Sequence, residues 1–272
     1  YPTKKKYLQT FANLARSIPK HGLIVACKDG PNVAETVKHS KCKVITYGKS
    51  GADYAYSGIN QTKDGIDMEI QYEKRRVKIT SAVLGEHMAE NICGCFAMAK
   101  EVGVEEKIII ESINSFQGIK RRLEKRHEGI ITIYDDLGHS PAKAAASLKT
   151  LRAIYPNSKI TAIFEPNTGN RKSQSAPSYA RAFKDADEVI IPLLTKIKID
   201  QKDPDPPFGG AELTKIISQT HPQAVFMDKD DKLIEYVKNN TKKEDVIVFL
   251  GSHGFRGMIE ELIISLRPPL HK

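Results

Sequence analysis

The chain has 272 residues, of which 40% are hydrophobic and 28% are charged. This composition is typical of a folded globular protein and excludes an intrinsically disordered chain. No apolar run approaches the roughly 18 residues of a membrane span, and the sequence does not open with a signal-peptide pattern, so we expect no association with a membrane.

Basic residues outnumber acidic residues by 42 to 33, which gives a formal net charge of +9. The excess is spread along the chain, and such a field attracts polyanions of any kind. Because the chain has no tryptophan and only 7% aromatic residues, it shows little sign of a surface on which bases stack. Two interpretations stay open: a solvated basic surface without a ligand, and a non-catalytic α/β module that binds nucleotides or nucleic acid.

The four cysteines have neither the spacing of a disulfide framework nor that of a CxxC metal motif. Cys93 and Cys95 lie in an apolar helical pattern, which favours buried free thiols over a metal site. Free thiols are typical of a reducing compartment, and we therefore predict a cytoplasmic protein.

Up to about residue 82 the pattern predicts short strands and turns. The expected strands are two compact apolar runs and three segments of alternating apolar and polar residues: Gly22–Cys27, Lys43–Tyr47, Asp53–Ser57, Ile66–Tyr72 and Arg76–Thr80. The three alternating segments indicate a meander of antiparallel strands with one solvated face. Apolar stripes at helical spacing then predict helices over Glu86–Lys100 and Glu105–Phe116.

From about residue 129 strands and helices alternate. The expected strands are Ile130–Tyr134, Lys159–Glu165, Glu188–Leu193, Ala224–Met227 and Asp245–Leu250, and the expected helices are Pro141–Tyr155, Ser175–Lys184, Gly210–Thr220, Asp230–Asn239 and Gly254–Ser265. Continuous apolar strands separated by helices indicate a Rossmann-like, doubly wound, mainly parallel sheet. The long irregular stretch Thr195–Phe208 is a candidate functional flap.

Polar clusters follow three of these strands: Asp135–Pro141, Glu165–Arg171 and Gly251–Phe255. In open α/β sheets ligands bind at the carboxyl ends of the strands, so we expect the three clusters at one ligand-binding edge. The paired aspartates could hold a ribose hydroxyl or a cation, and the helix after them could offer free N–H groups to an anion. In the alternative interpretation Asp136 and Ser140 only cap that helix.

The stretch Gly48-Lys49-Ser50 resembles the end of a phosphate-binding P-loop, but the pattern GxxxxGK[ST] requires a glycine where Lys43 stands. No other stretch of the 272 residues fits this pattern. By themselves these residues therefore lack the usual means of holding the β- and γ-phosphates of a nucleotide together with magnesium.

Four segments, taken in order, resemble motifs of the Mur ligases, a family of ATP-dependent enzymes that form amide bonds in peptidoglycan synthesis. Tyr1-Pro2 resembles the end of the motif DHxDxYP, and Gly85–Asn91 resembles GxHNxxN. Phe116–Glu124 is similar to FxGxxRRxE, and Tyr134–Pro141 is similar to YDDYGHHP. The resemblance spans essentially the whole chain.

The resemblance implies an α/β fold in two parts. Residues 1–124 would be the later half of the central ATP-binding domain, a β-meander with helices, and residues 125–272 would be the whole Rossmann-like C-terminal domain. The boundary would fall in the charged stretch Lys120–Gly129, and the junction near Leu123–Gly129 would be an exposed hinge. The UDP-binding domain, the P-loop and the main ligands of Mg²⁺ would lie in missing amino-terminal regions, so we expect this chain to hold no metal and to be inactive alone.

The resemblance also implies roles for individual residues. Arg122 would be the catalytic residue and would bind the γ-phosphate of ATP, Asp136 would hold the ribose, and His87 with Asn91 would frame the adenine. Five further residues would contact the incoming substrate: His139, Asn167, Arg171, Ser252 and Phe255.

The implied reaction joins UDP-N-acetylmuramate to an amino acid or a peptide. ATP first phosphorylates a carboxylate, and an amine then attacks the resulting acyl phosphate. The expected partners are these substrates and the missing domains, with no nucleic acid. Phe164–Pro166 and Gly251–Phe255 are most similar to the branch that recycles murein tripeptide, and next to the branch that adds L-alanine. Met88, Ser140 and Asn167 depart from the family pattern.

Overall fold

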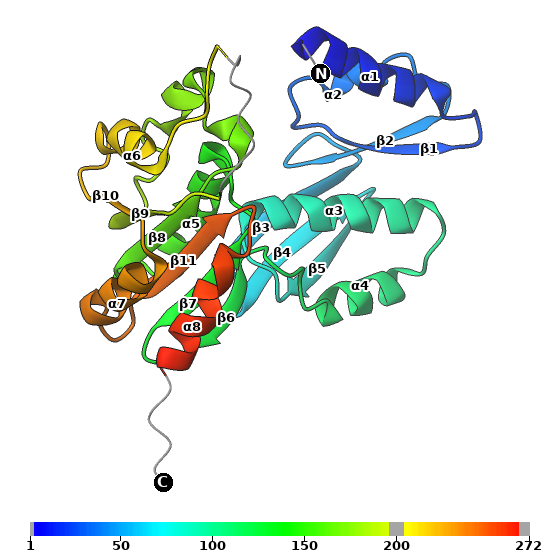
Figure 1. The fold of residues 1–272 in the computed structure, drawn as a ribbon. Helices are drawn as coiled ribbons and strands as arrows, with labels where there is room; N and C mark the ends of the chain where they lie inside the picture. The colour runs from blue at the N-terminus through cyan, green and yellow to red at the C-terminus, as the bar shows by residue number, and fades with distance from the viewer. Residues whose placement is uncertain (1–2, 196–203, 267–272) are drawn as a thin grey trace. The chain divides into compact units, whose positions relative to one another are not determined.

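The computed structural model describes residues 3–195 and 204–266, and it divides into two compact units, one up to Gln117 and one from Gly118 (Figure 1). Each unit is built on a sheet of its own. No helix among the described residues is long and apolar enough to cross a membrane. All four cysteines are free thiols.

The first sheet has five strands in the order β1-β2-β3-β4-β5. They are β1 Leu23–Cys27, β2 Lys43–Gly48, β3 Tyr54–Thr62, β4 Gly65–Tyr72 and β5 Arg75–Ser81. Strands β3, β4 and β5 pair antiparallel, which confirms the expected meander, whereas β1 and β2 pair parallel. A parallel pair needs a crossover connection, and the short helix α2 (Val33–Val37) lies in it.

Two helices follow this sheet in the chain, α3 (Glu86–Glu101) and α4 (Glu106–Ser115), each within one residue of its expected bounds. The apolar stripe of α3 faces the sheet: Phe96 is fully buried against Tyr54 and Tyr72, whose rings stack at 5.1 Å. The core of the first unit therefore lies between α3 and the strands of the meander.

Helix α1 (Lys4–Ser17) is absent from the expected elements. Thr3 caps it, since the Thr3 hydroxyl accepts a hydrogen bond from the backbone N–H of Lys6 at 3.2 Å. Only Ala15 of this helix is buried. Tyr7, Phe11 and Leu14 lie at helical spacing and are exposed, so the pattern that indicates this amphipathic helix is present in the sequence although the prediction did not use it.

The second sheet has six strands in the order β10-β9-β8-β11-β7-β6. They are β6 Glu124–Glu128, β7 Thr132–Asp136, β8 Ile160–Glu165, β9 Glu188–Pro192, β10 Ala224–Met227 and β11 Val246–Gly251. All pairs are parallel except β6 with β7, so the predicted doubly wound, mainly parallel sheet is confirmed. Every residue of β7, β8, β9 and β11 is buried, as continuous apolar strands require.

Four α-helices accompany this sheet: α5 Pro141–Ile154, α6 Gly210–Ser218, α7 Asp230–Asn240 and α8 Met258–Ser265. Leu233 of α7 and Leu262 of α8 share one core with Ile133 of β7. The next side chain along β7, Tyr134, points to the other face and hydrogen-bonds Tyr155 at the end of α5 at 2.9 Å. Because β7 and β11 are neighbours and α5 and α8 follow them on opposite faces, a topological switch point lies at their carboxyl ends.

Three expectations for this unit differ from the structure. The predicted helix Ser175–Lys184 is a 3₁₀ helix, η2 (Ser173–Tyr179), followed by turns, because Pro177 lacks the N–H that an α-helix needs. The predicted helix from Gly254 starts at Met258, after the 3₁₀ turn η3 (Phe255–Gly257). The charged stretch expected as an exposed hinge contains strand β6. Of the predicted flap, residues 196–203 lie outside the described part of the chain.

Candidate functional site

The structure brings the three predicted polar clusters together at the carboxyl ends of β7, β8 and β11, which are adjacent strands. The backbone N–H of Asn167, after β8, donates to the carbonyl of His139, after β7, at 3.3 Å. The carboxylate of Glu165, at the end of β8, lies 3.8 Å from Nδ1 of His253, after β11. This edge coincides with the switch point, where ligands bind in such sheets.

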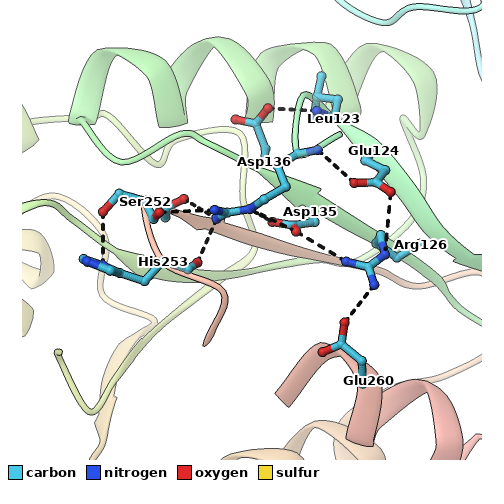
Figure 2. A network of polar contacts seen from close by, with 10 residues as sticks. Leu123, Glu124, Arg126, Asp135, Asp136, Ser252, His253 and Glu260 are labelled. Carbon is cyan, nitrogen blue, oxygen red and sulfur yellow. Dashed lines mark hydrogen bonds and ion pairs between the residues drawn. The ribbon is translucent and has the colours of Figure 1, made fainter. Parts of the chain in front are cut away.

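Arg121 links the loop before β6 to the end of β11, and Figure 2 shows the surrounding network. Its Nε lies 3.2 Å from Oδ2 of Asp135. Its terminal nitrogens donate to the backbone carbonyls of Gly251 at 2.8 Å, Ser252 at 3.1 Å and His253 at 2.7 Å. One planar guanidinium therefore fixes the backbone that follows β11, a task for which its fork of donors is suited.

Asp135 is 2% exposed and lies within reach of a second guanidinium, that of Arg126, at 3.5 Å. Arg126 also pairs with Glu260 of α8 at 2.8 Å and with Glu124 at 3.8 Å (Figure 2). Burial raises the pKa of Asp135, and the charges of the two arginines oppose this shift. Asp135 is thus committed to ion pairs inside the protein.

Arg122 is presented on a fixed backbone. Its neighbours Arg121 and Leu123 have left-handed φ angles of 61° and 46°. The Arg121 N–H donates to Glu124 at 2.8 Å, and the Leu123 N–H donates to Oδ2 of Asp136 at 2.8 Å. The Arg122 side chain is exposed, and no hydrogen bond or ion pair within the described residues engages it. It is therefore a cation that an anionic ligand can use.

Asp136 is 4% exposed, and each of its carboxylate oxygens accepts a hydrogen bond. Oδ2 binds the Leu123 N–H, and Oδ1 accepts from the hydroxyl of Ser147 at 2.9 Å. The capping interpretation holds for Ser140, which is the N-cap of α5 and accepts from the N–H of Lys143, but not for Asp136. A carboxylate has further lone pairs, so a ribose hydroxyl would share Asp136 with the protein.

His139 has one ring nitrogen, Nδ1, that is buried and without a hydrogen-bond partner in the described part of the chain. Its Nε2 lies 3.5 Å from Nζ of Lys143. Burial lowers the pKa of His139, and the positive charges of Lys143 and Arg122 lower it further. The imidazole is therefore neutral at neutral pH and able to accept a hydrogen bond.

Two predicted substrate contacts bind other parts of the protein. Oδ1 of Asn167 accepts from the N–H of Asn170 at 3.1 Å and thereby caps the 3₁₀ turn η1 (Thr168–Asn170). Arg171 is 8% exposed, and its guanidinium donates to the carbonyls of Phe208 at 2.9 Å and Thr195 at 3.4 Å. Arg171 thus anchors the two ends of the predicted flap.

The remaining two predicted substrate contacts differ in access. Ser252 is half-buried, and its hydroxyl lies 3.1 Å from Nδ1 of His253. Phe255 is fully buried and packs edge-on against Phe249 with ring centroids 5.1 Å apart. The ring of Phe255 therefore belongs to the core of the second unit and does not line a surface that a substrate reaches.

His87 and Asn91 lie in the first unit, on α3, and both are exposed. Residues four apart share one face of a helix, so both side chains are presented on the same side. Met88, which departs from the family pattern, is 8% exposed, and its sulfur accepts from Nδ2 of Asn91 at 3.7 Å. Met88 thus packs in the core and orients the amide of Asn91.

A hollow of about 750 Å³ opens in the first unit beside β2 and β3. Its lining includes Lys43, Tyr54 and Glu101, which are joined by an ion pair at 2.5 Å and a hydrogen bond at 2.9 Å. None of the predicted site residues is among its lining residues in the described chain. No pattern in the sequence indicates this hollow.

The described carboxylates at the carboxyl edge of the second sheet do not suit magnesium. Asp135 pairs with arginines, Glu165 lies 3.4 Å from Arg256, and both oxygens of Asp136 accept hydrogen bonds. Mg²⁺ needs oxygen ligands in a near-octahedral set. The residues at this edge therefore fit a phosphate group, through Arg122, and do not fit a metal ion.

Sequence reasoning assigned no role to three charged residues that build this edge: Arg121, Arg126 and Glu165. Glu165 is 1% exposed, and Oε1 accepts from the Thr195 N–H at 2.7 Å. The available signal was a charged residue directly at the end of an apolar strand for Glu165, and a cluster of both charge signs along Glu124–Glu128 for Arg126. Such a signal does not identify which partner each charge selects.

Comparison with known proteins decides the family. The Mur ligase middle domain matches residues 1–99, and the Mur ligase glutamate ligase domain matches residues 121–253. The chain belongs to the Mur ligase family. Among curated relatives, the UDP-N-acetylmuramate–L-alanine ligase of Caldanaerobacter subterraneus is 28% identical over 249 residues, which are 90% of this chain and 53% of that protein.

A relative of the same name from Aquifex aeolicus is 26% identical over 97% of this chain and 57% of its own length. This Mur ligase chain thus spans about half the length of the curated relatives it matches.

Solved structures confirm the α/β fold of this Mur ligase chain. The UDP-N-acetylmuramate-alanine ligase of Thermotoga maritima has a TM-score of 0.76 at 19% identity, covering 97% of this chain and 55% of that one. A murein peptide ligase from Psychrobacter arcticus has a TM-score of 0.69 at 21% identity, covering 96% of this chain and 55% of that one. The MurF ligase of Thermotoga maritima, solved in complex with ADP, has a TM-score of 0.75 at 15% identity, covering 97% of this chain and 58% of that one.

Proposed function

We propose that this chain forms part of an ATP-dependent ligase that joins UDP-N-acetylmuramate to an amino acid or a peptide through an acyl phosphate. Membership of the Mur ligase family supports the reaction class, and the names of the relatives support UDP-N-acetylmuramate as the acid substrate. The observation that carries the proposal is Arg122, an exposed cation on an anchored backbone at the switch point of the second sheet.

ATP supplies the phosphoryl group that activates the carboxylate. Negative charge shifts over the transferring oxygens, and the preorganised guanidinium of Arg122 stabilises it without having to reorganise. His87 and Asn91 contact the adenine, and the carboxylate of Asp136 accepts a hydrogen bond from a ribose hydroxyl. The metal ligands are supplied by residues other than those described at this edge.

The amine substrate meets the neutral imidazole of His139 and the hydroxyl of Ser252. A neutral imidazole accepts a hydrogen bond from an incoming amine, which the lowered pKa of His139 supports. Asn167 and Arg171 act on this substrate through the loops that they fix. We further propose a cytoplasmic location, which the four free thiols support.

The test is the release of phosphate by an active ligase that contains residues 1–272. We expect release to require UDP-N-acetylmuramate together with L-alanine or with the tripeptide L-alanyl-γ-D-glutamyl-meso-diaminopimelate, and the two amines are assayed separately. Arg122→Ala should lower kcat about 100-fold, the scale of losing one preorganised charge contact. Lys120→Ala removes an exposed cation two residues away and serves as the control. Equal turnover in the Arg122→Ala and Lys120→Ala enzymes would refute the assignment.

A further inference from the structure

The ends of the parallel strands in the first unit carry a group of metal-binding side chains that the proposed reaction does not use. Cys27 ends β1, Asp29 follows two residues later, and Glu90 lies on α3. One ligand atom of each residue lies within 4.8 Å of those of the other two. Ligand atoms at about 2.0–2.3 Å from one tetrahedral zinc ion lie about 3.3–3.8 Å apart. Small side-chain rotations therefore bring all three onto one ion.

The surrounding structure holds these donors in place. The backbone N–H of Lys49 donates to Oδ2 of Asp29 at 2.9 Å, which orients that carboxylate. Cys27 is held by the pairing of β1 with β2, in which it lies opposite Tyr47. Glu90 is half-buried, and within the described residues no hydrogen bond or ion pair engages its carboxylate. The donors are thus oriented by their own elements, as in a metal site with supporting outer contacts.

Without a cation, this group places like charges together. The sulfur of Cys27 and one carboxylate oxygen each of Asp29 and Glu90 lie within 4.8 Å of one another. Lys49 forms an ion pair with Glu86 at 2.6 Å and interacts over a longer range with Asp29 and Glu90, and Lys28 donates to the carbonyl of Gly51. A bound divalent cation neutralises the two carboxylates and holds the sulfur as a thiolate ligand.

We propose that Cys27, Asp29 and Glu90 bind one Zn²⁺ ion. A thiolate with two carboxylates suits a borderline-soft cation, whereas Mg²⁺ and Ca²⁺ select oxygen ligands alone. Three protein ligands leave the fourth position of a tetrahedral ion to water. The site lies within the first unit and does not rest on the proposed ligase function.

The test uses residues 1–272 without a purification tag, freed of metal by a chelator. Calorimetric titration should show one Zn²⁺ bound per chain, and the Co²⁺ form should show a thiolate-to-metal charge-transfer absorption band. Cys27→Ser and Glu90→Gln should each weaken Zn²⁺ binding by at least about tenfold, and Cys27→Ser should abolish the band. Zn²⁺ should also raise the melting temperature of the original chain.

Cys95→Ser is the matched control, because Cys95 is an exposed thiol on the same helix as Glu90 and lies outside the group. It should keep the affinity, the band and the rise in melting temperature. Circular dichroism verifies that each variant is folded, and Glu90→Gln keeps the test valid if Cys27→Ser misfolds. An absence of Zn²⁺ binding, or binding of equal strength in the Cys27→Ser, Glu90→Gln and Cys95→Ser chains, would overturn the proposal.

Discussion

Two adjacent arginines of the second unit have opposite surroundings, and this contrast gives a prediction at the scale of residues. Arg121 donates to three carbonyls and to Asp135, whereas Arg122 is exposed. A lysine at position 121 cannot reproduce the planar fork and leaves buried acceptors unsatisfied. We expect Arg121→Lys to lower the free energy of unfolding by about 1–3 kcal/mol and Arg122→Lys to change it by less than about 0.5 kcal/mol. Urea unfolding followed by circular dichroism measures both free energies. Equal effects of the two substitutions would contradict the structural role of the Arg121 guanidinium.

His139 gives a prediction about pH. Its folded pKa lies below the ordinary value of about 6.5, because burial and nearby cations disfavour the charged imidazolium. The unfolded state therefore takes up a proton first as the pH falls below about 7, and stability is lost in that window. The neutral variant His139→Gln should lose less stability than the original chain between about pH 7.5 and pH 5. The other histidines are the same in both chains, so their contributions cancel when the two stability profiles are compared. Parallel pH profiles of the two chains would refute the lowered pKa of His139.

At this scale the sequence predicts where polar residues gather but not what each one binds. The strand-end rule places Asp136, His139, Asn167 and Ser252 at one edge, and the structure agrees. The rule cannot show that both oxygens of Asp136 accept hydrogen bonds from the protein. Nor can it show that Phe255 turns into the core, because a positive φ of 51° at that residue sets the direction of the chain.

At the scale of elements, prediction succeeds for the parallel strands of the second sheet. The fully buried strands β7, β8, β9 and β11 lie within two residues of their predicted bounds, and the partly buried strand β10 (Ala224–Met227) has its predicted bounds. Strand β6 is missed because its residues are polar and only half-buried, whereas helix α1 is missed although Tyr7, Phe11 and Leu14 follow helical spacing. The parallel pairing of β1 with β2 depends on a crossover that no residue pattern specifies.

Strand β6 changes what we expect from proteolysis. Its charged sequence predicts exposed trypsin sites, but Arg126 forms ion pairs with Asp135 and Glu260, and the strand is paired with β7. Peptide bonds held in a sheet resist cleavage because the chain must first open locally. We expect the bonds after Arg121, Lys125 and Arg126 to outlast the bond after Lys41, which lies in an exposed bend between α2 and β2. Mass spectrometry of a time course gives the order, and first cuts within β6 would contradict it.

At the scale of the whole molecule, the question is whether residues 1–272 bind and use ATP without other residues. Phosphate affinity in P-loop enzymes comes largely from the loop amides, the lysine and bound magnesium, and the pattern that encodes this loop does not occur in these residues. The candidate contacts that remain are Arg122, Asp136, His87 and Asn91, and none of them is proposed to bind magnesium. Positioning two reactants provides roughly 7–11 kcal/mol of a typical barrier reduction, and it also requires a binding site for the UDP-sugar. We therefore expect calorimetry to show weak or undetectable binding of ATP, and phosphate release equal to a protein-free blank in the presence of UDP-N-acetylmuramate and L-alanine. Substrate-dependent phosphate release by purified residues 1–272 would show that they contain a nucleotide site that neither the motifs nor the described geometry reveals.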